Sequence, residues 1–145
     1  EGKALKFLTN SRCASGTGMF LKIASSILGL KIEELDELFF QSRDFCELQS
    51  TCAVFAESEI ISLIHEGKKI EDIVKGVMWA IANKIYGFLV EIGAEEPLFL
   101  SGGLGRMKSV KILLEEKLGK RVIVPENPLI VNALGAALIA KERSQ

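Results

Sequence analysis

Apolar residues recur along most of the chain with the spacing of helices that bury one face. Between residues 17 and 28 they fall at Phe20, Ile23, Ala24 and Ile27, which form one stripe on a helix because they follow i, i+3, i+4, i+7 spacing. Comparable patterns predict further helices over 33–42, from the acidic turn at 57–59 to Gly67, and over 70–92, 107–118 and 132–142. The stripe of 70–92 is too broad for a surface helix, so we expect this helix to contact several partners.

Short, uninterrupted apolar runs predict the strands. They cover 4–9, 98–101 and 122–124, and the last two are separated by one predicted helix. Strands that are apolar throughout and alternate with helices are typical of a parallel α/β unit. Residues 43–51 have no periodicity and are expected to form a loop.

Composition restricts the classes of function. The chain has 145 residues, 48% of them hydrophobic, and a formal net charge of −1, which gives no electrostatic reason to expect nucleic acid or anionic lipid as a partner. No apolar run approaches the roughly 18–20 residues of a bilayer span, and no signal-peptide pattern is present. Three cysteines fit a reduced compartment better than a disulfide framework. We therefore expect a cytoplasmic protein without a membrane partner.

The turn between the first predicted strand and the first predicted helix carries the strongest chemical signal. It contains Cys13, Gly16, Thr17 and Gly18. Glycines let a ligand approach the backbone, and a helix start presents free N–H groups and a positive dipole end. The turn therefore suits an anion, either a phosphate or a metal–thiolate cluster. The same residues also suit a tight turn around a buried structural cysteine.

Two further turns precede helices. Cys52 comes before the acidic turn, and 101–103 follow a predicted strand with the sequence Ser-Gly-Gly. Ligands of open α/β sheets bind beyond the carboxyl ends of the strands, so we expect the turns at 16–18 and 102–104 to flank one cleft. The second of these lacks the lysine of a P-loop and the spacing of a dinucleotide fingerprint.

Together, these stretches resemble the BadF/BadG/BcrA/BcrD-type ATPases, which are activators of 2-hydroxyacyl-CoA dehydratases and ATPase subunits of benzoyl-CoA reductase. The matching stretches are 10–21, 52–64, 100–104 and 132–138. The two that contain cysteine are the more specific. The Gly-Gly turn is common to the wider actin/hexokinase/chaperone ATPase superfamily.

The resemblance implies an α/β fold that is the C-terminal part of an actin-like (ribonuclease H-like) ATPase lobe. Residues 1–145 would form a single partial domain whose phosphate-binding strands lie upstream. The sheet of such a lobe has the strand order 3-2-1-4-5, with 4–9 as strand 3, 98–101 as strand 4 and 122–124 as strand 5. Strands 4 and 5 should then pair in parallel, and strand 3 should have no neighbour and an open edge.

The resemblance also implies a cofactor and partners. Two identical subunits would share one [4Fe–4S] cluster, with Cys13 and Cys52 of each copy as its ligands. The full-length ATPase would use ATP to donate low-potential electrons to a dehydratase or reductase in anaerobic metabolism. Because the upstream motifs that manage phosphate and Mg²⁺ are not in this sequence, the fragment alone is expected to be inactive.

For the nucleotide, the resemblance assigns two turns. The positions are Gly16, Thr17 and Gly18 at the phosphates of ATP or ADP, and Gly102, Gly103 and Leu104 at the adenosine. Met107 stands where the family often has Asn, which puts one nucleotide contact in doubt.

Other interpretations stay open. The chain could instead be a non-redox nucleotide-binding domain of the sugar-kinase or chaperone type, or a regulatory domain of a larger activase. Cys46 matches no family motif and is interpreted as a spare thiol. His65 is interpreted as a charge partner at the end of its helix, and Glu57 and Glu59 as acids of a first helical turn.

Overall fold

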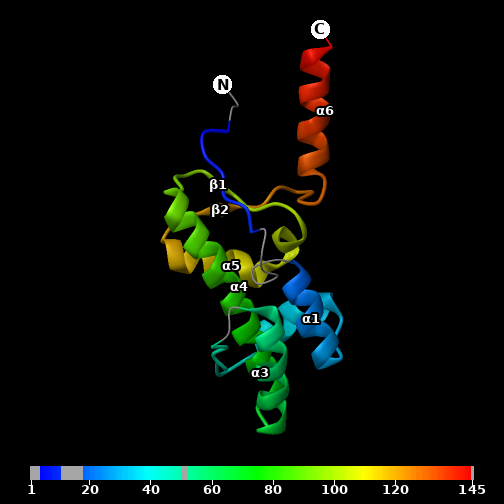
Figure 1. Cartoon of the computed structure of the whole chain (residues 1–145), viewed down its shortest axis with the longest axis vertical. Helices are drawn as coiled ribbons and strands as arrows, with labels where there is room; N and C mark the ends of the chain where they lie inside the picture. Colours follow the sequence, from blue (N-terminus) through cyan, green and yellow to red (C-terminus); the bar gives the residue numbers. More distant parts are fainter. Residues whose placement is uncertain (1–3, 11–17, 50–51, 145) are drawn as a thin grey trace.

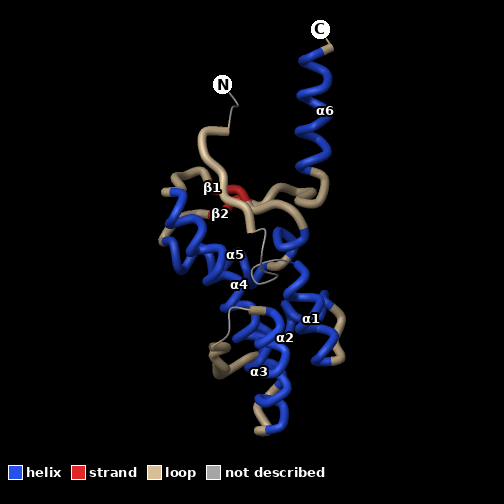
Figure 2. The backbone as a smooth tube through the Cα atoms, viewed as in Figure 1, coloured by secondary structure: helices blue, strands red, loops and turns tan. Residues whose placement is uncertain are grey.

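The computed structural model describes residues 4–10, 18–49 and 52–144, and these are mostly helical (Figure 1). Figure 2 shows the two short strands in the upper middle of the molecule, below α6, and α1, α2 and α3 gathered toward the lower end. In chain order the elements are α1 (Gly18–Leu28), α2 (Ile32–Gln41), α3 (Ala53–His65), α4 (Ile70–Ile92), β1 (Leu98–Phe99), the 3-10 helix η1 (Gly103–Arg106), α5 (Lys108–Leu118), β2 (Val122–Ile123) and α6 (Val131–Arg143).

The helices expected from apolar spacing are present, and one of them begins earlier than predicted. α3 starts at Ala53 rather than at the acidic turn, because Cys52 has the extended backbone of an N-cap and its carbonyl accepts a hydrogen bond from the Ala56 N–H at 2.9 Å. The small apolar residues that follow Cys52 fit a first helical turn as well as they fit a lead-in, so periodicity alone did not locate this boundary. Gly29 and Gly119 follow α1 and α5 with φ of 67° and 61°, as expected for glycines that end helices.

The core is built around α4, which packs against both α5 and α2. Its inner face is fully buried at Ile73, Val74, Val77, Met78, Ile81 and Ala82. By length and composition α4 is the one helix in the described part of the chain that is apolar enough to cross a membrane. The expectation that no segment has this property is therefore wrong. Burial of the apolar stripe between α2 and α5 identifies α4 as the central helix of the domain core.

The loop after α2 is attached to the start of α4 by Asp72. Ser42 Oγ and the Asp44 N–H donate to Asp72 Oδ1 at 2.8 and 3.0 Å, and the Cys46 N–H donates to the Asp72 carbonyl at 3.2 Å. Burial by itself raises the pKa of the Asp72 carboxyl, but these hydrogen bonds and nearby positive charge outweigh it, so its pKa lies below the usual value. A Cβ at Gly76 would overlap the Cys46 carbonyl, so only glycine permits this close contact.

The sheet has two strands among the described residues. β1 and β2 are parallel, with Leu98 opposite Val122 and Phe99 opposite Ile123. The prediction that strands 4 and 5 pair in parallel, with α5 as their connection, is confirmed.

The strand predicted over 4–9 is not formed. Residues 4–10 have no regular structure, and Leu5 and Phe7 are 99% and 75% exposed. Lys6 Nζ in this segment donates to the Glu91 carbonyl at 3.2 Å. A strand needs a neighbour for its N–H and C=O groups, and in this structure residues 4–10 pair with neither described strand. The prediction of a strand was therefore wrong, although its lack of pairing with 98–101 agrees with the expected strand order.

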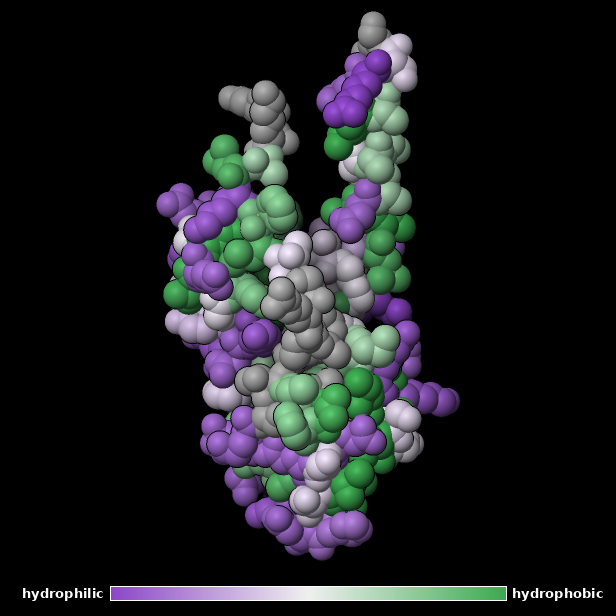
Figure 3. All heavy atoms as spheres, viewed as in Figure 1, coloured by the Kyte–Doolittle hydropathy of each residue, from purple (hydrophilic) through white to green (hydrophobic). Residues whose placement is uncertain are grey.

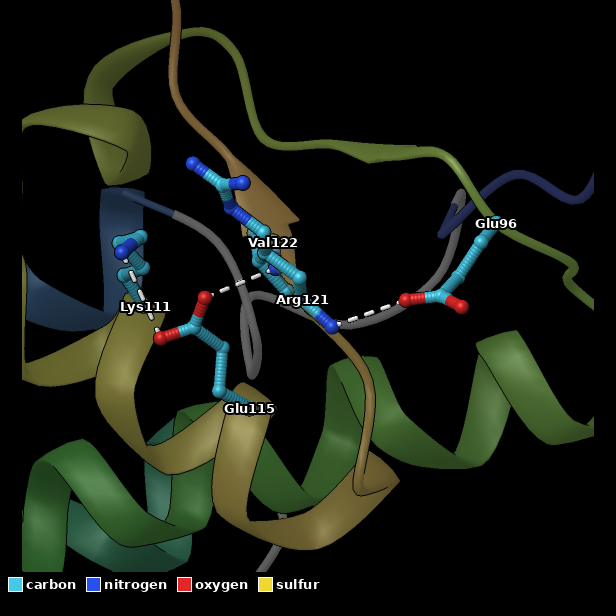
Figure 4. Close-up of polar contacts among 5 residues, drawn as sticks. All are labelled: Glu96, Lys111, Glu115, Arg121 and Val122. Carbon is cyan, nitrogen blue, oxygen red and sulfur yellow. Dashed lines mark hydrogen bonds and ion pairs between the residues drawn. The ribbon is translucent and has the colours of Figure 1, made fainter.

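Two carboxylates hold the start of β2 (Figure 4). The Val122 N–H donates to Glu115 Oε1 at 2.9 Å, and the Arg121 N–H donates to Glu96 Oε1 at 3.1 Å. Lys111 Nζ lies 3.4 Å from Glu115 Oε2. The Val122 N–H is the main cause that lowers the pKa of the Glu115 carboxyl from its ordinary 4.5.

We expect Glu115→Gln to lower the free energy of unfolding by about 1 kcal/mol at pH 7, because the amide keeps an acceptor but loses the charge. A carboxyl whose pKa is lower in the folded state stabilises the fold above its unfolded pKa. This contribution is lost as the pH falls through the folded pKa. Urea denaturation of wild type and variant should therefore converge below the ordinary pKa of 4.5. Glu116→Gln, at an exposed neighbouring position, is the control, and an equal effect from it would contradict this role.

Candidate functional site

A cleft of about 510 Å³ lies between the start of α1, the start of α2 and η1. Its lining combines apolar side chains with two basic and two acidic ones, and such a mixture suits an organic ligand with a flat ring and a few polar groups. The lining residues are Gly18, Met19, Leu21, Lys22, Ile32, Glu33, Asp36, Gly103, Arg106, Met107 and Leu129.

The wall at η1 is shaped by a glycine turn. Gly102 has φ 78° and ψ −165°, a region that is open essentially only to glycine. Its N–H donates to the Pro128 carbonyl at 2.7 Å, and its own carbonyl accepts from the Gly105 N–H at 3.1 Å. Gly105 is buried so tightly that a Cβ there would touch Pro128 and the Leu100 carbonyl. The turn is thus fixed against the chain after β2, and Gly103 lines the cleft without a side chain.

The opposite wall begins where α1 begins. Gly18 and Met19 are the first residues of this helix, and Lys22 lies one turn further along. Gly18 and Gly103 therefore line the same cleft, as expected if the two glycine turns share one site. Gly16 and Thr17 lie outside the described residues. Leu104 does not line the cleft and instead packs against the core.

The basic and acidic side chains of the cleft come from different elements. Lys22 is on α1, whereas Glu33 and Asp36 are on α2, and Arg106 closes η1. Met107, where the family resemblance suggested Asn, is 5% exposed and forms part of the apolar floor.

The cysteines occupy different environments. Cys52 is the N-cap residue of α3 and is half-buried, and Val54 and Phe55, 71% and 67% exposed, follow it. Cys46 packs partly against the core, and burial raises the pKa of its thiol. Cys13 lies outside the described residues. Among the residues that the structure does describe, no group of three or more His, Cys, Asp or Glu side chains is placed to hold a metal ion.

The comparison with known proteins decides the family. The model of the BadF/BadG/BcrA/BcrD ATPase family matches residues 1–140. The chain belongs to this family. The resemblance seen in the motifs at 10–21, 52–64, 100–104 and 132–138 is thereby confirmed.

Family members of named function are similar along the whole chain. The chain is 36% identical over 145 residues to the 2-hydroxyisocaproyl-CoA dehydratase activator of Clostridioides difficile, covering 100% of the chain and 54% of that protein. It is 35% identical over 144 residues to the (R)-2-hydroxyglutaryl-CoA dehydratase activating ATPase of Acidaminococcus fermentans, covering 99% and 55%. Over 147 residues it is 32% identical to one of the subunits of benzoyl-CoA reductase from Thauera aromatica, covering 95% and 51%. The chain thus spans about half the length of these relatives.

Solved structures of the family confirm the fold class. The Clostridium difficile activator of 2-hydroxyisocaproyl-CoA dehydratase, solved with bound ADPNP, superposes with a TM-score of 0.92 at 37% identity, covering 98% of this chain and 53% of that one. Component A of (R)-2-hydroxyglutaryl-CoA dehydratase from Acidaminococcus fermentans gives a TM-score of 0.93 at 34% identity, covering 99% and 56%. The predicted α/β part of an actin-like ATPase lobe is therefore the fold of this family member.

Sequence reasoning missed the hydrogen-bonding roles of two acidic residues, of which Asp36 lines the cleft and Glu59 does not. Asp36 bonds to the start of α5, and Glu59 accepts a hydrogen bond from the Gln49 N–H at 2.7 Å. Both have the spacing of solvent-facing helix positions, so nothing local distinguishes them from the exposed Glu57. His65 is exposed in the last turn of α3, which fits its interpretation as a residue at a helix end.

We expect Gly102→Ala to lower the free energy of unfolding by about 1–3 kcal/mol, because alanine is strained at this φ and ψ. Gly103→Ala is the matched control. A Cβ there would meet no atom within 4 Å and φ is not positive, so stability should change by less than about 0.5 kcal/mol. Urea denaturation of both variants checks this, and similar losses in the two would show that backbone strain is not the cause.

Proposed function

We propose that this chain is part of an ATP-dependent activator that passes low-potential electrons to a 2-hydroxyacyl-CoA dehydratase or a benzoyl-CoA reductase-like enzyme. The observation that carries the proposal is the single cleft lined by both Gly18 and Gly103. It occurs in a chain that is about one-third identical to dehydratase activators, one of which was solved with ADPNP.

Charge sets the direction of the nucleotide in this proposal. The positive dipole at the start of α1, with Lys22 one turn along, favours the phosphates. At the other end, the start of α5 is already occupied by the Asp36 carboxylate, and Glu33 adds a second negative charge. That end suits the uncharged base and ribose, over the apolar floor at Met107.

We further propose that residues 1–145 form one partial domain and that the remainder of the family fold covers its open surfaces. No residue of α6 is buried, and Leu134, Leu138 and Ile139 are each more than half exposed. Figure 3 shows α6 standing clear of the body with apolar surface uncovered along it, at the end of the molecule where residues 4–10 also project. Together with the relatives, which are about twice as long, these exposed surfaces support a missing set of upstream strands.

For the iron–sulfur cluster, the chemistry of Cys52 fits the role of a ligand. The residue is half-buried at the start of α3, and the positive end of a helix dipole favours an anionic cluster. A [4Fe–4S] cluster takes four thiolates and supplies a low-potential electron when bound. We propose that Cys13 and Cys52 of two copies provide the thiolates, and that exposed Val54 and Phe55 are buried between the copies.

We expect ADP to bind this chain weakly, with a Kd on the order of 1 mM, because the upstream phosphate motifs are lacking. Amide NMR titration should shift the signals of Gly18, Lys22, Gly103 and Arg106, although calorimetry detects little or nothing. Lys22→Ala should weaken the binding of ADP but not that of adenosine. Lys68→Ala, at an exposed lysine outside the cleft, should change the affinity for neither ligand. Shifts confined to other surfaces, or none at all, would contradict a nucleotide site here.

Anaerobic reconstitution with iron and sulfide tests the cluster. The wild type should gain a broad visible absorbance and become dimeric, and Cys13→Ser or Cys52→Ser should lose both because a thiolate ligand is removed. Cys46→Ser is the matched control and should keep both. Persistence of the absorbance in Cys52→Ser would refute this ligand assignment. ADP binding without any cluster in the wild type would favour a non-redox nucleotide-binding domain.

A further inference from the structure

The two walls of the cleft are joined by one carboxylate. Asp36, on α2, accepts hydrogen bonds from the Lys108 N–H at 2.7 Å and from the Ser109 N–H at 3.1 Å. Ser109 Oγ also donates to Asp36 Oδ1, at 2.5 Å. Both carboxylate oxygens are therefore engaged at the first turn of α5. We call this set of contacts the Asp36 clasp.

α5 depends on the clasp because its own N-cap residue supplies no side-chain acceptor for the first N–H groups of the helix. The N-cap residue is Met107, and it makes no side-chain capping bond. The first N–H groups of a helix have no partner within the helix, so a side chain from elsewhere must accept from them. Asp36 supplies that acceptor from 72 positions earlier in the chain. Among the described residues, no other hydrogen bond or ion pair joins α2 to the η1–α5 segment.

The clasp also fixes the position of the wall that faces a ligand. Arg106 and Met107 directly precede the clasped residues, and the Met107 N–H donates to the Leu104 carbonyl at 3.0 Å. On the other side, Ile32 and Glu33 lie one turn before Asp36 on the same helix. Because η1 and α2 both line the cleft, the length of the clasp sets the separation of these two walls.

We propose that Asp36 is a positioning residue for the ligand of this cleft. Its carboxylate holds α2 against the start of α5 and thereby sets the gap that receives the base and ribose of a nucleotide, an assignment that rests on the proposed function. In this proposal Asp36 acts through its hydrogen bonds to the start of α5 and is assigned no contact with the phosphates or a metal ion. The clasp acts on the base end of the cleft and Lys22 on the phosphate end.

Amide NMR on the chain tests the clasp directly. In Asp36→Ala, hydrogen exchange at the Lys108 and Ser109 amides should accelerate at least about tenfold, because a hydrogen bond to a charged acceptor is lost. Asp36→Asn should restore part of the protection, since the amide oxygen still accepts from one N–H. Glu37→Ala is the matched control, because Glu37 is exposed on the same helix and its carboxylate accepts a bond from Gln41. Exchange within α4 should stay unchanged, which separates loss of the clasp from general destabilisation.

Ligand binding then tests the positioning role. Asp36→Ala should weaken the binding of adenosine and of ADP by the same factor, about three- to tenfold, and Asp36→Asn should have an intermediate effect. Lys22→Ala should weaken the binding of ADP alone. Unchanged exchange at Lys108 and Ser109 in Asp36→Ala would overturn the clasp. Faster exchange with unchanged affinity would overturn the positioning role. If wild type binds neither ligand, the proposed function fails and the positioning role fails with it, and the exchange result still decides whether the clasp exists.

Discussion

Burial of one face of α4 is the constraint on which the rest of the structure depends. Ile73, Val77 and Ile81 are completely inaccessible to solvent, and the helices that cover them, α2 and α5, are the same two that carry the Asp36 clasp. Because a packed interior tolerates little displacement, α4 fixes where α2 and α5 lie. The cleft between the start of α2 and η1 is therefore a consequence of how the core is filled.

Carboxylates from distant positions in the chain accept hydrogen bonds from backbone N–H groups that the small sheet and the loops leave without a backbone partner. A sheet of two short strands satisfies few backbone N–H groups, and each buried N–H without a partner costs free energy. In this structure acidic side chains accept from backbone N–H groups, both part-buried and exposed, at the start of α5, in the loop after α2 and at the start of β2. These acids are Asp36, Asp72, Glu59, Glu96 and Glu115. The charge of the chain is thus used for internal capping as well as for solvation.

Two helices that pack against each other connect the candidate nucleotide cleft to the candidate cluster ligand. α1 begins at the cleft with Gly18, and it packs against α3, which begins after Cys52. A change in the position of α1 would therefore be felt at the start of α3, because packed helices move together. In the proposed function, the packing of α1 on α3 would connect the nucleotide site to the cluster ligand.

The sequence by itself determined the helices, their glycine ends and the parallel pairing of β1 with β2. Helical hydrogen bonds are satisfied within one segment, and the φ of Gly29 or Gly119 is a local property, so apolar spacing and glycine position are sufficient. The motifs around Cys13, Cys52 and Gly102 likewise identified the family before any fold was known. Tertiary structure alone decided that residues 4–10 form no strand, that α6 is uncovered and that Asp36 caps α5. A strand edge, a covered helix face and a cap across a cleft each need a partner far away in sequence, and no local pattern specifies that partner.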